Sequence, residues 1–101
     1  GASADARDIR GITPVWVASA NGHVRVLREL VENGKLPDLK AAVDVADHSD
    51  RKTPLWAACW WGYVDVVREL LHLGANVETA RADGATPLWA ASRLGHLGIV
   101  R

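Results

Sequence analysis

A six-residue pattern, Thr-Pro-aliphatic-Trp-x-Ala, occurs three times in this chain of 101 residues and constrains its fold more than any other feature. The copies begin at Thr13, Thr53 and Thr86. In the first two copies, glycines follow the threonine at intervals of nine and 21 residues, so both copies share their internal spacing. Self-similarity at a period of about 20–50 residues is typical of a repeat array. The sequence therefore predicts a stack of similar units, and such stacks usually bind other molecules.

The unit that begins at Thr53 predicts two short antiparallel helices. The Thr53 hydroxyl can accept a hydrogen bond from a free backbone amide, and Pro54 fits the first helical position, where no N–H is needed. Gly62 is expected to end this helix and Gly74 to end a second one that starts near residue 64. The second helix places its apolar residues on one face: Val66, Val67, Leu70 and Leu71.

The first two copies are separated by 40 residues and the last two by 33, so the first interval contains seven additional residues. They fall between Gly34 and Thr53, and the segment Lys35–Lys40 is the expected insertion. A longer surface connection costs little loop-closure entropy, so the array can tolerate it.

The three segments TPVWVASANGHVRVLRELVENG, TPLWAACWWGYVDVVRELLHLGANV and TPLWAASRLGHLGIVR resemble successive ankyrin repeats. The resemblance covers about residues 8 to 101. It implies an all-α solenoid of stacked helix-turn-helix units with β-hairpin fingers, whose concave surface is formed by the fingers and the first helices. A single domain over residues 1–101 is expected, with repeats at about 8–40, 41–80 and 81–101, the last one incomplete.

The first four residues of the repeated pattern, Thr-Pro-aliphatic-Trp, form a tetrad that opens each unit. The chain departs from the ankyrin pattern at the fourth position of this tetrad and at one finger tip. Trp16, Trp56 and Trp89 stand where histidine is usual, so the usual imidazole hydrogen bond between repeats is expected to be absent. Arg51 stands at a finger tip where glycine occupies the other two units. If the turn stays left-handed there, Arg51 strains it by roughly 1 kcal/mol.

Trp60 and Trp61 are the first candidates for a binding site. They precede the helix-ending Gly62, at positions that the resemblance places in the concave groove. Exposed tryptophan and arginine side chains contribute heavily to interface energy. The structural alternative is that Trp56 packs with the other tetrad tryptophans and that Trp60 only leans on Trp56. The predicted partner-binding residues are Trp60, Trp61, Arg93, Leu94, Asp50, Arg51 and Lys52, with the finger Arg81–Ala85 beside them.

These features predict a scaffold that binds a protein or peptide on its concave, Trp-rich surface. Two alternatives remain open: a reader of methylated lysine, because indole faces attract quaternary ammonium ions, and a purely architectural or oligomerisation module. Neither end of the array carries a polar cap. We therefore expect self-association, or a longer array that supplies the missing helix. The apolar residues at the two ends are Ile9, Ile12, Leu88, Leu97, Ile99 and Val100.

Composition argues against several other classes of function. Twelve basic residues balance 12 acidic ones, so no net field attracts nucleic acid or an anionic membrane. No apolar run approaches the roughly 20 residues of a membrane-spanning helix. A single cysteine, Cys59, precludes an internal disulfide and favours a reducing compartment, cytoplasmic or nuclear.

No residue pattern indicates an enzyme, a cofactor or a metal. Cys59 has no general base near it in sequence and aligns with small residues, so we interpret it as a structural thiol. His48 lies among acidic residues, but no further ligands complete a closed metal site, and a solvated turn is the simpler interpretation. His23, Tyr63 and His96 occupy the same step after a glycine, which indicates a packing role within each repeat.

Overall fold

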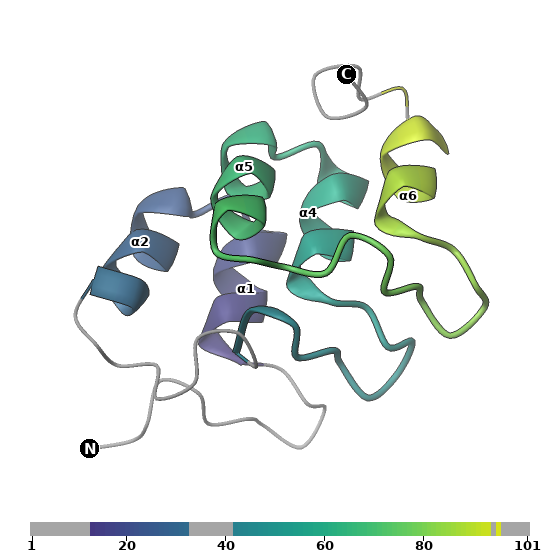
Figure 1. The fold of residues 1–101 in the computed structure, drawn as a ribbon, viewed down its shortest axis with the longest axis horizontal. Coiled ribbons are helices and arrows are strands. Elements are labelled where there is room, and N and C mark those ends of the chain that lie inside the picture. The colour runs from purple at the N-terminus through teal and green to yellow at the C-terminus, as the bar shows by residue number, and fades with distance from the viewer. Residues whose placement is uncertain (1–12, 33–41, 94, 96–101) are drawn as a thin grey trace.

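The computed structural model of the chain describes residues 13–32, 42–93 and 95 (Figure 1). Its helices are α1 (Pro14–Ala20), α2 (Val24–Glu32), α4 (Pro54–Trp61), α5 (Val64–His72) and α6 (Pro87–Arg93). Several residues named above lie outside the described part of the chain: Ile9, Ile12, Gly34, Lys35–Lys40, Leu94, His96, Leu97, Ile99 and Val100.

Each copy of the repeated tetrad starts a helix in the same way. The Thr13 Oγ1 accepts a hydrogen bond from the Trp16 backbone N–H over 3.1 Å, and Thr53 and Thr86 repeat this contact with Trp56 and Trp89 at the same distance. This satisfies one of the amides that a helix leaves free at its start. The predicted threonine caps are therefore confirmed in all three units.

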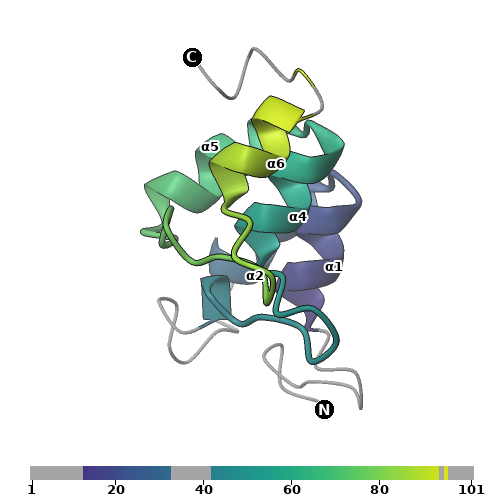
Figure 2. The ribbon, with the colours of Figure 1, turned by 90° about the vertical axis from the view of Figure 1, so that its right-hand side faces the viewer.

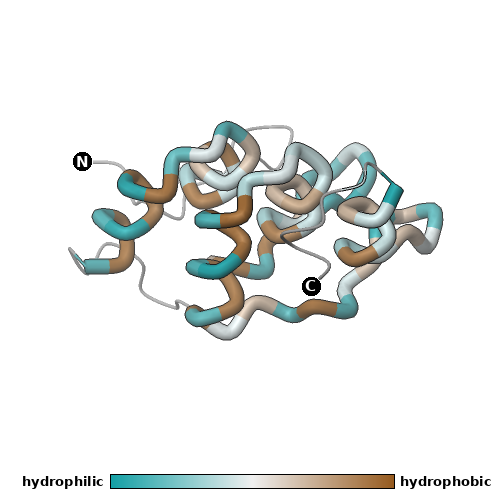
Figure 3. Tube along the Cα trace, turned by 90° about the horizontal axis from the view of Figure 1, so that it is seen from above, coloured by the Kyte–Doolittle hydropathy of each residue, from teal (hydrophilic) through white to brown (hydrophobic). Residues whose placement is uncertain are grey.

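The helices form two layers. Helices α1, α4 and α6 lie side by side in one layer, and α2 and α5 form the other (Figures 1 and 2). Hydrophobic and hydrophilic residues alternate along the helical coils (Figure 3), so each layer can direct apolar side chains toward the other. Small residues on the first helices, such as Ala58 and Ala90, are fully buried and allow close packing. The core lies between the layers and is continuous across the units.

The two described fingers are turns and contain no strand, so the expected β-hairpin fingers are wrong in this respect. In the first finger the Asp47 N–H donates to the Lys52 carbonyl over 3.0 Å. The Lys52 N–H, which would return that bond in a hairpin ladder, instead donates to Asp47 Oδ1 over 3.0 Å. In the second finger Asp83 captures the Ala85 N–H in the same way, over 3.1 Å. The carboxylates thus take the donors that a strand ladder needs.

Arg51 has a backbone φ of 60°, and Gly84 occupies the matching position of the next finger with a φ of 91°. The predicted left-handed turn at Arg51 is confirmed. For a residue with a Cβ atom, this conformation costs about 1–2 kcal/mol. The fingers also contact each other, because the Ala82 N–H donates to the Asp50 carbonyl over 2.7 Å.

Candidate functional site

Two tetrad tryptophans link successive units through their indole N–H groups. Trp16 Nε1 donates to the Lys52 carbonyl over 2.8 Å, and Trp56 Nε1 donates to the Ala85 carbonyl over 2.9 Å. Both acceptors occupy the same position in the finger of the following unit. The imidazole hydrogen bond is absent as expected, but the indole makes a bond between units of its own. The Trp89 indole finds no acceptor among the described residues.

A row of stacked groups crosses from α4 over the second finger to α6; we call Trp60, Trp56, Arg81 and Trp89 the tryptophan–arginine row. The rings of Trp60 and Trp56 are stacked, with centroids 5.5 Å apart and planes inclined by 14°. The Arg81 Cζ lies 4.6 Å from the Trp56 ring centroid and 5.7 Å from that of Trp89. Both distances fall within the range of cation–π attraction. The row therefore holds the second finger against two helices.

The exposed Asp83 side chain forms an ion pair with the Arg81 guanidinium. Arg81 Nε lies 3.0 Å from Asp83 Oδ1, and Nη2 lies 2.5 Å from Oδ2, which is a two-pronged ion pair. Hydrogen bonds from Arg81 first, and from the Ala85 N–H second, lower the pKa of Asp83 to about 2. The same carboxylate raises the pKa of Arg81 above its already high ordinary value. The cation of the row is therefore fixed in place and stays charged.

Exposure within this region varies widely from one tryptophan to the next. Trp56 retains 2% of its accessible surface, whereas Trp89 retains 42% and Trp61 retains 59%. Trp60 is half-buried against Trp56. Trp16 is also half-buried. The packing alternative is therefore met in part: Trp56 is buried and Trp60 packs on it, but the ring stacked on Trp56 is that of Trp60 and not of another tetrad tryptophan.

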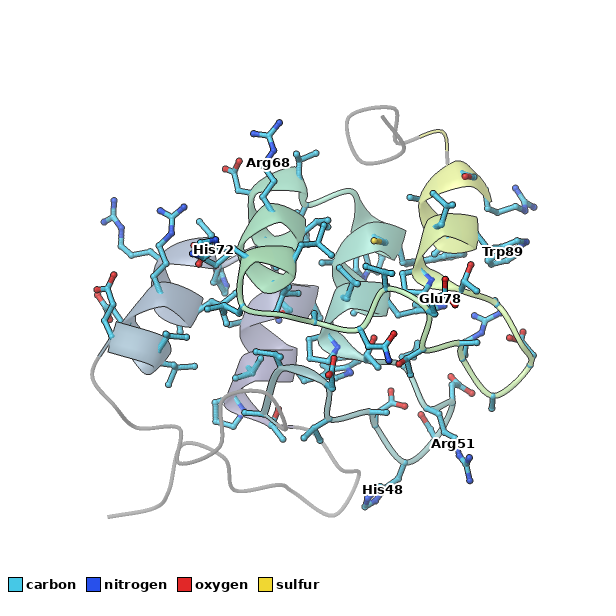
Figure 4. All side chains as sticks on the ribbon, in the orientation of Figure 1. His48, Arg51, Arg68, His72, Glu78 and Trp89 are labelled. Atoms are coloured by element: carbon cyan, nitrogen blue, oxygen red, sulfur yellow. The ribbon has the colours of Figure 1, made fainter. Side chains whose placement is uncertain are left out.

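The other predicted site residues lie around this row. Arg93 is exposed on α6, one helical turn beyond Trp89, which lies at the outer edge of α6 (Figure 4). Asp50 and Arg51 are exposed in the first finger, with Arg51 at its outer end (Figure 4). Lys52 Nζ lies 3.5 Å from Asp50 Oδ2. Leu94 lies outside the described residues.

The role of Arg81 in the tryptophan–arginine row was the hardest to predict from the sequence. Its finger was named as a polar neighbour of the site, but no local pattern indicates that its guanidinium lies over two indole rings. The one available signal is position: Arg81 precedes by four residues the carbonyl that accepts the Trp56 indole bond.

The comparison with protein families agrees with this architecture. The family model described as ankyrin repeats, three copies, matches residues 1–81. The chain belongs to the ankyrin repeat family. No curated protein matches it. Ankyrin repeats generally mediate protein–protein interaction, and the family is typically non-enzymatic.

Within this ankyrin array, the burial and contacts of Asp47 and Cys59 indicate structural roles for both residues. Asp47 is buried and its Oδ1 accepts backbone N–H bonds from Asp50 and Lys52, at 3.1 and 3.0 Å. Cys59 is a free, buried thiol, and desolvation raises its pKa to about 11. A thiol of this kind is protonated and unreactive at neutral pH. Across residues 13–32, 42–93 and 95, no three His, Cys, Asp or Glu side chains gather as a metal site would require.

None of the helices described here has the length and apolar character needed to cross a bilayer. The longest of them, α2 and α5, have nine residues each. A bilayer-spanning helix needs about 20.

Proposed function

We propose that this ankyrin array is a scaffold that binds a protein or peptide partner across the exposed edges of the tryptophan–arginine row and the fingers beside it. The observation that carries the proposal is the exposure of Trp61 and Trp89, at 59% and 42%, next to a fixed aromatic support. Large aromatic side chains with little conformational freedom lose little entropy on binding. Tryptophan and arginine are also the residues most enriched among interface hot spots.

The support under these residues argues for a preformed surface. Trp60 is stacked on the buried Trp56, and Arg81 is held by Asp83 between Trp56 and Trp89. A partner would therefore meet rings that already have fixed positions. Trp60 and Trp61 act in this proposal as support and anchor, respectively.

Polar specificity would come from charged groups that border the row. Arg93 and Arg51 are exposed on α6 and on the first finger. Asp50 and Lys52 pair with each other over 3.5 Å, and an exposed pair of this kind contributes little stability. Such a pair can open to meet partner charges at low cost. Leu94 follows Arg93 in sequence and completes the proposed set.

The tryptophan–arginine row supports a reader of methylated lysine less well than it supports a scaffold that binds a protein or peptide. Trp60 and Arg81 both stack against the Trp56 ring, so a quaternary ammonium would have to displace one of them. We also propose a non-enzymatic, intracellular role: the one thiol is buried and unreactive, and a chain with a single cysteine cannot form an internal disulfide. The architectural alternative is addressed by the same experiment as the binding role.

The test compares the proteins captured from a cell extract by four forms of the chain: wild type, Trp61→Ala, Trp89→Ala and the control Val26→Ala. Val26 is an exposed apolar residue on α2. It is distant from the row in sequence, and α2 belongs to the other helical layer from α4 and α6. We expect specific proteins to be retained by wild type and the control and lost from both tryptophan variants. Loss of affinity in a titration with the purified partner would then locate the surface. Capture of the same proteins by all four forms would refute the proposal.

A further inference from the structure

An apolar groove opens between α4, α5 and α6, separate from the tryptophan–arginine row. It has a volume of about 190 Å³. Its lining is mostly apolar and consists of Leu55, Cys59, Val67, Leu71, Val77, Pro87 and Leu88. Three of these side chains, Leu71, Val77 and Leu88, are large hydrophobic groups left exposed. A contiguous apolar surface of this kind is typical of an interaction site.

The same molecule shows what fits such a groove. A shift of 40 residues relates α2 to α5 and α1 to α4. The groove residues Leu55, Cys59 and Val67 correspond in this way to Val15, Ser19 and Leu27. All three are buried; Val15 and Leu27 belong to the core cluster, to which α5 contributes Val66 and Leu70 at 0% exposure. In the first repeat, therefore, the element that packs against the equivalent residues is an amphipathic helix, α5.

Leu55 and Leu88 are equivalent leucines in successive repeats, and they differ in how much of the side chain is covered. Both are the third residue of the tetrad, counted from Thr53 and Thr86. Leu55 retains 2% of its surface and Leu88 retains 56%. The local sequence is the same, so the difference reflects what packs against each leucine.

The positive charge of Arg68 on α5 indicates that a helix bound in the groove should carry a carboxylate. On α2, Arg28 Nε donates to Glu69 Oε1 of α5 over 2.7 Å, so an ion pair joins the two second-layer helices. Arg68 follows Arg28 by 40 residues and occupies the equivalent position on α5. It projects into solvent (Figure 4) and has no carboxylate partner among the residues that the structure describes. A helix packed beside α5 in the same manner would place a carboxylate within reach of Arg68.

We infer that this groove binds an amphipathic helix of a partner protein, with its apolar face in the register of α5 and a carboxylate that pairs with Arg68. The apolar pattern required is that of Val66, Val67 and Leu70, with the acidic residue at the position of Glu69. Helix-in-groove binding of this kind depends on apolar anchors at successive turns of the helix. The surface is distinct from the tryptophan–arginine row, so the two sites can be tested separately.

The probe is a stapled, fluorescein-labelled peptide with the sequence of residues 63–74, because an unstapled helix of this length is marginal in water. Its binding to the full chain is measured by fluorescence anisotropy. Leu88→Gln is expected to weaken binding at least tenfold, since it removes an apolar anchor from the groove. The matched control is Val17→Gln, a change at another exposed apolar helix residue, 44% accessible and outside the groove. This control should bind like wild type.

The predicted ion pair is tested by a double-mutant cycle. Arg68→Gln in the protein should weaken the wild-type peptide about two- to fivefold, as expected for an exposed pair. The same variant should not change the affinity of a peptide in which the residue at position 69 is Gln. Equal effects on both peptides would overturn the charge assignment.

Four results would overturn the groove assignment. The peptide could fail to bind, or Val17→Gln could weaken it as much as Leu88→Gln does. Binding could also appear only after Ile99 and Val100 are changed to Gln, which would assign the groove to the chain's own segment 96–101. Sedimentation of the protein alone supplies the fourth: a dimer that Leu88→Gln dissociates, without peptide binding, would assign the groove to a second copy.

Discussion

Replacing Trp56 by phenylalanine should destabilise the array far more than the same change at Trp89. Trp56 is buried, and its indole N–H donates to the Ala85 carbonyl of the following finger over 2.9 Å. Losing this bond removes about 0.5–1.5 kcal/mol and leaves the carbonyl without its donor. The smaller ring also weakens the stack with Trp60 and the contact with Arg81, each worth about 0.5–1.5 kcal/mol.

Together these losses predict a decrease of about 2–3 kcal/mol in the free energy of unfolding of Trp56→Phe. This is a large part of the roughly 5–15 kcal/mol that stabilises a typical domain. For a domain of this size, the midpoint of thermal unfolding should fall by about 10–20 °C. Trp89→Phe should change the stability by no more than about 0.5 kcal/mol, because its ring is exposed.

Urea unfolding followed by circular dichroism measures both variants, with Trp16→Phe as an intermediate case. Trp16 loses the equivalent bond to the Lys52 carbonyl but has no described ring partner. The expected order of destabilisation is Trp56, then Trp16, then Trp89. Equal destabilisation by Trp56→Phe and Trp89→Phe would refute the idea that the indole bonds link the units.

Three further predictions concern a glycine, a thiol and a carboxylate. Gly22→Ala should cost at least about 1 kcal/mol more than Gly84→Ala in urea unfolding; both have a left-handed φ, but only the new Cβ at position 22 would lie 2.8 Å from a ring carbon of Tyr63. Equal costs would contradict the predicted clash. The pKa of Cys59 is about 11 in the folded chain against an ordinary 9.0, so its contribution to stability is present below pH 9 and lost as the pH rises through 11. Wild type should therefore lose more stability than Cys59→Ala between pH 8 and 10.5, and parallel losses would argue against this. The pKa of Asp83 is about 2 against an ordinary 3.8, so its contribution is present above pH 3.8 and lost as the pH falls through 2. In an NMR titration the Asp83 midpoint should return toward 3.8 when its arginine partner becomes Gln, and an unchanged midpoint would exclude that cause.

The helices were the most predictable part of the structure, because their determinants are local. Thr53 and Pro54 start α4, and Gly62 ends it with a φ of 79°, as the sequence predicts. The resemblance to ankyrin repeats implies strands in the fingers, and this prediction is wrong for the two described fingers. Their absence from the described residues depends on two hydrogen bonds, in which Asp47 and Asp83 accept the N–H groups that a ladder would use.

The roles of the tryptophans could be predicted only in part. The sequence indicates that Trp56 is packed between repeats, but not that its N–H donates to a carbonyl 29 residues away. That bond depends on how closely two units stack. Trp56 and Trp89 have the same local sequence and different exposure, because the second finger covers Trp56, whereas no described residue covers Trp89 in the same way.

Solvent exchange of the indole N–H groups tests the central claim most directly, since the claim is that some tryptophans link the repeats while others stay open to a partner. Nitrogen-15 spectra resolve these groups, and Trp→Phe variants assign them. We predict slow exchange for Trp16 and Trp56, whose N–H groups donate to carbonyls at 2.8 and 2.9 Å, and fast exchange for Trp61 and Trp89. Fast exchange at Trp56, or strong protection at Trp61 and Trp89 in the unbound protein, would contradict the account.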